Sequence, residues 1–343
     1  MNSYFDPSAA ASKGSGIFGL PHGPEEARII LIPVNWELTV SYGRGTFHGP
    51  ELIKKASLQV DLYNHDFPNL WEQGIWMDEF PTELRALHKT LRHDAEAIIS
   101  AVEDGSMDDS WPVYKLIYKK ILEGSEQLNN WVKNRVDHWR SKGKIVGIVG
   151  GDHSTPYGYH AYLSEKETEY GILTIDAHMD LRNAYEGFKY SHASIFYNTM
   201  QFRNVTKLIQ LGIRDYSHDE MEYFAGNSNV VVFFDRDIRK QLFQGKSWQY
   251  LVDEIIGQLP DCVYVSVDID GLDPKLCPHT GTPVPGGLDF EELMYLLNRL
   301  KASGKEVIGF DLCEVAPNLK DENDEWDGNV GARVLYHLCG VVG

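Results

Sequence analysis

The stretch YGILTIDAHMD, residues 170–180, joins a short apolar run to a closing group of charged residues. The run 170–175 is apolar at nearly every position and not at alternate positions, which is typical of a strand buried on both faces of a parallel sheet. Asp176, His178 and Asp180 follow at a spacing of two. At the end of a strand this spacing points side chains to the same side. The stretch therefore predicts a buried parallel strand that ends in a group of metal-binding residue types.

Six further apolar runs resemble the run at 170–175, and longer stretches with helical spacing separate them. This alternation is typical of βαβ units, with helices covering both faces of a parallel sheet. We therefore expect an α/β fold with a single domain, in three α/β/α layers around a mostly parallel central sheet. The six runs are ARIILIPV (27–34), KIVGIVG (144–150), KLIQLGI (207–213), NVVVFF (229–234), CVYVSV (262–267) and EVIGFDL (306–312).

The rest of the chain departs from this rhythm in two places. Residues 1–26 are rich in Gly, Ser, Ala and Pro, and we interpret them as an N-terminal arm. Residues 27–343 then form the α/β domain, which carries a helical, acidic insertion at about 61–144. The sequence leaves open whether this insertion only packs and oligomerises, and it leaves the role of the arm open as well.

The net charge and the cysteines limit which ligands and which cellular location we expect. The chain has 50 Asp and Glu residues against 32 Lys and Arg residues, a formal charge of -18. This charge disfavours nucleic acid and anionic membranes and suits a small cationic substrate, although the charge taken alone favours surface acids that only give solubility. The four cysteines show no CxxC pairing, which favours reduced core residues. We see no signal peptide and no run of about 18 apolar residues, so we expect a cytoplasmic protein.

Four of the predicted strands end in unusual residues, at 150–154, 176–180, 268–273 and 313–314. The carboxyl ends of parallel strands form the ligand crevice, so these segments should converge. So many carboxylates without compensating cations would cost several kcal/mol, and divalent metals remove that cost. An oxygen-rich set with two imidazoles favours Mn²⁺ or a similar ion, and four anionic ligands suit a pair of ions. The six candidate ligands are His153, Asp176, His178, Asp180, Asp268 and Asp270.

Five segments in a fixed order resemble the ureohydrolase family. They are GGDHS (150–154), DAHMD (176–180), SVDIDGLDP (266–274), TGTPVPGG (280–287) and EVAP (314–317). This family includes arginase, agmatinase, guanidinobutyrase, formimidoylglutamase and guanidine hydrolase. The resemblance runs from about Ile29 to the C-terminus, and as an ordered set the five segments are far more specific than any one of them.

The resemblance implies an arginase-like fold, a homo-oligomer (trimer or hexamer) and two divalent ions per chain, Mn²⁺ first and Ni²⁺ second. A metal-bridging hydroxide would attack the guanidino carbon of the substrate and release urea. His192 resembles the family's proton shuttle, and Glu314 resembles the glutamate that pairs with the guanidinium. One ion would be held by His153, Asp176, Asp180 and Asp268, and the other by Asp176, His178, Asp268 and Asp270. Asp152 and Ser154 flank a ligand, and we expect them to support its imidazole.

The exact substrate stays open among agmatine, guanidinobutyrate, guanidine, arginine and formimidoylglutamate, with an agmatine-like substrate favoured. Arg182 resembles formimidoylglutamase and could bind a substrate carboxylate, whereas His192 does not fit that enzyme. Trp36, Thr39 or Tyr42 could line a small pocket, which would suit guanidine. Two hypotheses that assign the chain to another functional class are a single-metal deacylase and a non-catalytic regulatory relative.

Overall fold

The computed structural model describes residues 5–12, 14–107, 111–166 and 168–343. Its centre is one sheet of eight strands in the order β2-β1-β3-β8-β7-β4-β5-β6, in which every neighbouring pair runs parallel. The strands are β1 (Ile29–Val34), β2 (Ile75–Met77), β3 (Ile145–Gly150), β4 (Tyr170–Ile175), β5 (Val205–Ile213), β6 (Val230–Phe234), β7 (Cys262–Asp268) and β8 (Glu306–Cys313).

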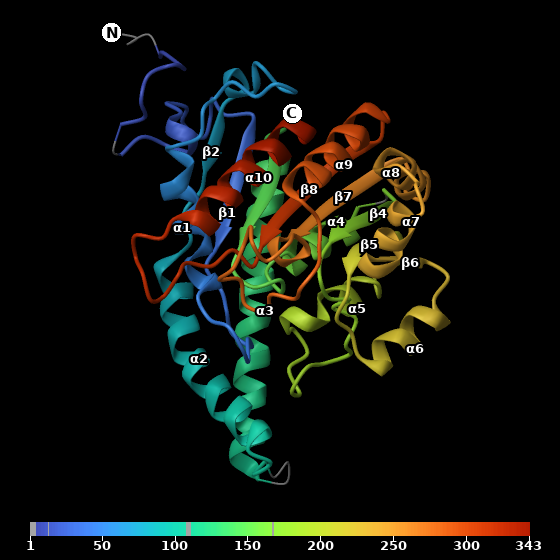
Figure 1. Ribbon diagram of the computed structural model, residues 1–343. Coiled ribbons are helices and arrows are strands. Elements are labelled where there is room, and N and C mark those ends of the chain that lie inside the picture. Colours follow the sequence, from blue (N-terminus) through green and yellow to red (C-terminus); the bar gives the residue numbers. More distant parts are fainter. Residues whose placement is uncertain (1–4, 13, 108–110, 167) are drawn as a thin grey trace.

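Helices cover both faces of this sheet, so the molecule has three layers (Figure 1). Alternate residues of β1 show the two faces: Ile29 and Leu31 pack into one apolar core, and Ile30 and Ile32 pack into the other. The predicted α/β fold with three layers and a parallel sheet is thereby confirmed. The helices are α1 (Gly49–Ser57), α2 (Thr82–Glu103), α3 (Pro112–Ser141), α4 (Tyr157–Ser164), α5 (Ile195–Thr199), α6 (His218–Gly226), α7 (Asp235–Phe243), α8 (Trp248–Gly257), α9 (Phe290–Ala302) and α10 (Trp326–Val342).

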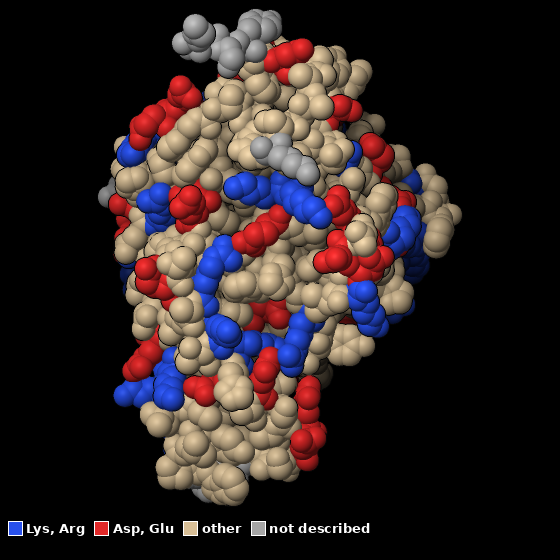
Figure 2. All heavy atoms as spheres, turned by 90° about the vertical axis from the view of Figure 1, so that its left-hand side faces the viewer, with Lys and Arg blue, Asp and Glu red and all other residues tan. Residues whose placement is uncertain are grey.

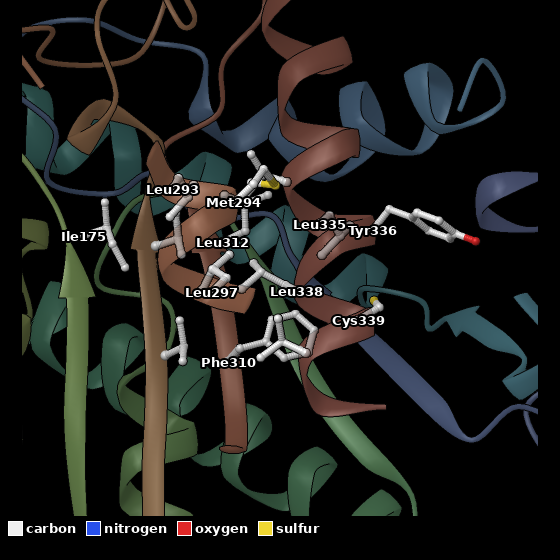
Figure 3. Close-up of a cluster of buried hydrophobic side chains, with 14 of the residues drawn as sticks. Ile175, Leu293, Met294, Leu297, Phe310, Leu312, Leu335, Tyr336, Leu338 and Cys339 are labelled. Atoms are coloured by element: carbon white, nitrogen blue, oxygen red, sulfur yellow. The ribbon is translucent and has the colours of Figure 1, made fainter. Parts of the chain in front are cut away.

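One of the two cores lies where α9 and α10 pack against the centre of the sheet (Figure 3). Leu297 of α9 and Leu338 of α10 lie close to Phe310 and Leu312 of β8, and all four are buried. Complete burial of side chains of this size contributes roughly 1.5–3 kcal/mol each. The core therefore fixes β8, whose last residues enter the site described below.

The seven apolar runs correspond to seven of the eight strands. The sequence analysis did not find β2, which has three residues and pairs with β1 at the edge of the sheet. A run of three is too short to show a period. It lies inside the segment 61–144, which therefore contributes an edge strand to the sheet as well as helices.

Helices α2 and α3 pack against each other and form a hairpin that projects beyond the sheet (Figure 1). Residues 108–110, between them, lie outside the described residues, as do 1–4 and 13 of the segment interpreted as an arm. Within that segment Ile17, Phe18 and Leu20 are buried in the core. Residues 17–20 of this segment are therefore part of the packed body of the molecule.

Charged side chains of both signs are interspersed on the face that Figure 2 shows. Exposed ion pairs such as Arg85–Glu51 and Lys55–Glu325 join residues of opposite sign. Pairs of this kind contribute at most about 1 kcal/mol each. Across the part of the chain that the structure describes, no helix has the length and apolar character needed to cross a membrane.

Candidate metal centre

Four neighbouring strands lie in the middle of the sheet, in the order β3-β8-β7-β4, and because they are parallel their carboxyl ends lie along the same edge. His153 follows β3, Glu314 follows β8, Asp268 ends β7, and Asp176 follows β4. The strand ends that carry the unusual residues are therefore adjacent in space, although up to 161 positions separate them in the sequence, as between His153 and Glu314. All six candidate ligands lie at this edge.

A first group of side chains surrounds the imidazole of His153. Its Nδ1 lies 3.1 Å from Asp176 Oδ2, 3.1 Å from Asp180 Oδ2 and 3.2 Å from Asp268 Oδ2. All four side chains are almost completely buried. One nitrogen and three carboxylate oxygens thus face a common centre.

A second group adjoins the first and surrounds His178. Its Nδ1 lies 3.1 Å from Asp270 Oδ2 and 3.6 Å from Asp176 Oδ1. Asp176 therefore belongs to both groups, with one carboxylate oxygen facing each imidazole. This sharing gives two adjacent sets of donors linked by one carboxylate.

The crowding of these groups changes their protonation. Burial and the neighbouring Asp176 raise the pKa of Asp180 to about 7. Burial and the charges of Asp270 and Asp176 raise the pKa of Asp268 well above its usual value. Burial lowers the pKa of His153, but the carboxylates beside it outweigh burial and raise that pKa well above its usual range. Without a bound cation the cluster therefore retains protons at neutral pH.

The donor set fits divalent cations. His153 Nδ1 and Asp176 Oδ2 are fully buried and lie 3.1 Å apart, but within the described residues neither atom forms a hydrogen bond of good geometry. Polar atoms left in this state cost roughly 1–3 kcal/mol each, and a cation between them would remove that cost. Three groups of ligand atoms among the described residues are close enough to hold an ion. Two of them share Asp176 and face the cavity: His153 with Asp176 and Asp268, and Asp176 with His178 and Asp270. The third is His153 with Asp311 and Cys313. Carboxylates with imidazole suit Mn²⁺ and similar ions.

The backbone at the site is strained in two places. Asp180 has a φ of 53° and Glu314 a φ of 64°, in the left-handed region that side chains other than glycine rarely adopt. Such strain persists only where surrounding contacts impose it, and it concentrates at functional sites. Gly271 is required for close packing and not for its backbone angles, because a Cβ there would lie 2.6 Å from the backbone nitrogen of Asp176. The loop after β7 can approach β4 this closely only with glycine at that position.

The second nitrogen of His153 has a different partner from the expected one. Nε2 lies 2.9 Å from Ser266 Oγ, and this hydroxyl donates to Asp311 Oδ1 at 3.0 Å. Ser266 and Asp311 are register partners on β7 and β8. Such contacts fix the orientation and tautomer of a ligating imidazole. An aspartate inside the buried strand EVIGFDL is the signal that could have revealed this chain of contacts.

Asp152 and Ser154 do not support the imidazole, so that expectation was wrong. Asp152 instead accepts hydrogen bonds from the backbone nitrogens of Leu38 and Ser154 and from the Ser154 hydroxyl. Its carboxylate is thus occupied in holding the loop around the ligand. The sequence analysis placed Asp152 near His153 correctly but could not give the direction of its side chain.

Glu314 and His192 both line a cavity of about 210 Å³ above the metal-binding residue types. Glu314 is buried, and its Oε1 accepts a hydrogen bond of 2.9 Å from the backbone nitrogen of His153. Burial and the charge of Asp268 raise the pKa of Glu314 well above its usual value. Burial and the positive charges of His178 and His153 lower the pKa of His192 to about 3. His192 is therefore a neutral imidazole at physiological pH.

The rim of the cavity is aromatic and charged. Tyr42 lines it and is 80% exposed, whereas Trp36 and Thr39 are buried and not among the lining residues. Arg182 also lines it, with Nε 3.6 Å from Glu220 Oε2 and the guanidinium 5.0 Å from the centre of the Tyr185 ring. A cavity of about 210 Å³ suits a small ligand.

Arg214 is a further residue of the site that the sequence analysis missed. Its guanidinium donates to the backbone carbonyls of Asp270, Leu272 and Val284 at 2.6, 3.1 and 3.0 Å. The Arg214 guanidinium thus links the loop that follows β7 to the segment around Val284. Its position in KLIQLGIRD, just after a predicted strand, gives no hint of these contacts.

The chain is similar to known proteins over nearly its whole length. The family model described as "Arginase family" matches residues 27–340. An N(1)-aminopropylagmatine ureohydrolase of Thermus thermophilus is 31% identical over 328 residues, 95% of this chain and 94% of that protein. An agmatinase of Pyrococcus horikoshii is 27% identical, over 92% and 93% of the two chains. The agmatine ureohydrolase structure from Thermoplasma volcanium aligns with a TM-score of 0.71 at 23% identity, covering 96% and 95% of the chains.

A metal titration tests the donor set. We expect chelator-treated protein to bind two equivalents of Mn²⁺ per chain and to unfold at a higher temperature when loaded. Affinity should fall as the pH drops below about 7, because the ions must displace protons from Asp180, whose pKa is about 7, and from neighbouring groups. Isothermal titration calorimetry and elemental analysis measure both effects.

Asp176→Asn should lower the stoichiometry, while Asp219→Asn on the exposed surface of α6 should not. Wild-type protein that binds fewer than two equivalents at pH 8 would contradict the pair.

Proposed function

Since this chain belongs to the arginase family and is a hydrolase of the ureohydrolase type, we propose that it cleaves a guanidino C–N bond of a small, amine-tailed compound such as agmatine and releases urea. The observation that carries the proposal is the convergence of two imidazoles and four aspartates in two adjacent donor sets that line or adjoin a small cavity. Water adds to the guanidino carbon, the C–N bond to the tail breaks, and the products are urea and an amine.

We assign one ion to His153, Asp176, Asp180 and Asp268, and the other to Asp176, His178, Asp268 and Asp270. Mn²⁺ is the proposed metal and Ni²⁺ the alternative. When bound, such a pair supplies an activated water as nucleophile at neutral pH. The chain contributes the fixed geometry: Ser266 and Asp311 orient His153, and Arg214 holds the loop that carries Asp270.

Glu314 and His192 are the proposed groups that act on the substrate. The Glu314 carboxylate faces the cavity and can accept hydrogen bonds from two guanidinium nitrogens. A bound guanidinium also offsets the cost of ionising this buried glutamate. His192 also lines the cavity, and its ring can relay a proton from the attacking water to the leaving amine. Without that proton the amine is a poor leaving group.

The charges at the rim support an amine tail. The guanidinium of Arg182 faces the buried Glu220 and stacks on Tyr185, so its charge is already balanced and a substrate carboxylate would find little attraction there. Asp215 also lines the cavity, is exposed, and shows no ion pair within the described residues. An ammonium group at the far end of the substrate would meet this carboxylate and the face of Tyr42 or Tyr216. These charges favour agmatine over guanidinobutyrate and formimidoylglutamate.

Guanidine is the second candidate, because the cavity of about 210 Å³ is smaller than most ligand pockets. The alternatives of another class have less support: a single-metal deacylase needs one zinc ion, and a non-catalytic relative would not need to retain a complete donor set. A cytoplasmic location and assembly into a trimer or hexamer remain predictions from the sequence.

A product assay tests the proposal. Enzyme loaded with Mn²⁺ or Ni²⁺ is incubated with agmatine, guanidinobutyrate, guanidine, arginine and formimidoylglutamate, and urea, formamide and ammonia are measured separately. We expect urea from agmatine at the highest kcat/KM. Absence of urea from every compound, with two ions bound per chain, would refute the proposed activity.

Asp215→Asn tests the assignment of the amine tail. Exposed ion pairs are worth up to about 1 kcal/mol, so we expect KM for agmatine to rise roughly fivefold. The inhibition constant of guanidine, which has no tail, should not change. Asp219→Asn, also at an exposed position, is the matched control. An equal loss of affinity for agmatine and guanidine would contradict a contact with the tail.

His192→Ala tests proton transfer. General acid–base groups contribute about 10²–10⁴-fold, so we expect kcat to fall by about 10² or more with both ions retained. His218→Ala, whose side chain is 85% exposed on α6, should leave kcat unchanged. Near-normal turnover of His192→Ala would remove this residue from the mechanism.

A further inference from the structure

Two loops form much of the rim of the active-site cavity. Loop 38–45 carries Tyr42, and loop 182–190 carries Arg182 and Tyr185. Neither loop is a regular strand or helix. Their positions must therefore be set by contacts with the rest of the molecule, and the α2–α3 hairpin supplies contacts to both.

Helix α3 holds the loop 182–190 through Tyr118. Its hydroxyl donates to the backbone carbonyl of Glu186 at 2.8 Å, and its ring lies 5.4 Å from the ring of Phe188, which is buried. Gly187 has a φ of 82°, and a Cβ there would lie 2.7 Å from the Tyr118 ring. The tip of the loop thus packs directly against one side chain of α3.

Tyr185 connects this tip to His192, and both residues line the cavity. The backbone amides of Tyr185 and Phe188 donate to each other's carbonyls at 3.2 and 2.8 Å, which closes a tight turn around Glu186 and Gly187. The Tyr185 ring meets the ring of His192 edge to face at 5.8 Å. A shift of the turn would therefore move Tyr185 relative to His192.

Helix α2 holds the loop 38–45. Arg92 donates to the backbone carbonyl of Leu38 at 2.9 Å and pairs with Glu96 at 3.0 Å. Glu96 in turn pairs with Arg44 at 2.8 Å. The hairpin therefore grips this loop close to both ends, on either side of Tyr42.

We infer that the α2–α3 hairpin supports the rim of the substrate cavity, and that Tyr118 is a positioning residue for the loop that carries Arg182 and Tyr185. This inference rests on the proposed function for its kinetic consequences. None of the contacts just described involves a candidate metal ligand, so the hairpin acts on the rim of the cavity and not on metal loading.

Tyr118→Phe tests this role, because it removes one hydroxyl and keeps the ring. A hydrogen bond of this kind contributes about 1 kcal/mol, so we expect kcat/KM for agmatine to fall roughly fivefold. Because Tyr185 contacts His192, part of this loss should appear in kcat, while the metal content should not change. Tyr114→Phe, one turn away on α3, is the matched control.

Hydrogen exchange provides a readout that does not require activity. In Tyr118→Phe the amide of Phe188, which closes the turn, should exchange about five times faster than in wild type, with no change in Tyr114→Phe. Unchanged exchange at Phe188, or a loss of kcat and metal together, would overturn the inference. If wild type cleaves no guanidino compound, the proposed function fails while the exchange measurement still decides whether the hairpin supports the loop.

Discussion

The crowding of buried carboxylates around two imidazoles is the constraint on which the rest of this structure depends. Asp176, Asp180, Asp268, Asp270 and Glu314 are all 5% exposed or less. Burial of like charges at this density is unfavourable unless protons or cations compensate for it. A flexible scaffold would let the carboxylates move apart, so the site needs a rigid one.

The parallel sheet provides that rigidity, because four adjacent strands are hydrogen-bonded to one another and buried on both faces. Two further features hold the chain where the strands end. Arg214 binds three backbone carbonyls of the loop after β7 and the segment around Val284, and Gly271 lets this loop approach the end of β4. The left-handed backbone at Asp180 and Glu314 shows that the chain accepts local strain to aim these carboxylates.

Much of the fold and the grouping of the site residues could be predicted from the sequence because both depend on local patterns. Continuous apolar runs identified seven strands, and DAHMD and SVDID marked two of the strand ends that meet. The resemblance to the ureohydrolase family is confirmed by the family match over residues 27–340. The placement of His192 and Glu314 on the same cavity followed from that resemblance and not from any period in the sequence.

The features that could not be predicted depend on pairs of residues far apart in the chain. Arg182 alone suggested a carboxylate-binding site, and only its nearness to Glu220 shows that its charge is balanced. Likewise, Asp152 lies next to a ligand in sequence, but Ser266 is the residue whose hydroxyl lies within hydrogen-bond distance of Nε2 of the His153 imidazole. Side-chain direction in loops and partners across strands carry no signal in a single sequence.

The hairpin contacts both rim loops through their backbone: Tyr118 binds the carbonyl of Glu186, and Arg92 binds the carbonyl of Leu38. A carbonyl is present whatever the side chain at that position. Residues such as Tyr42, Arg182 and Tyr185 can therefore be exchanged without loss of these anchors. A scaffold of this kind allows the preference for the far end of the ligand to diverge among descendants of one ancestor while the hydrolytic core stays intact.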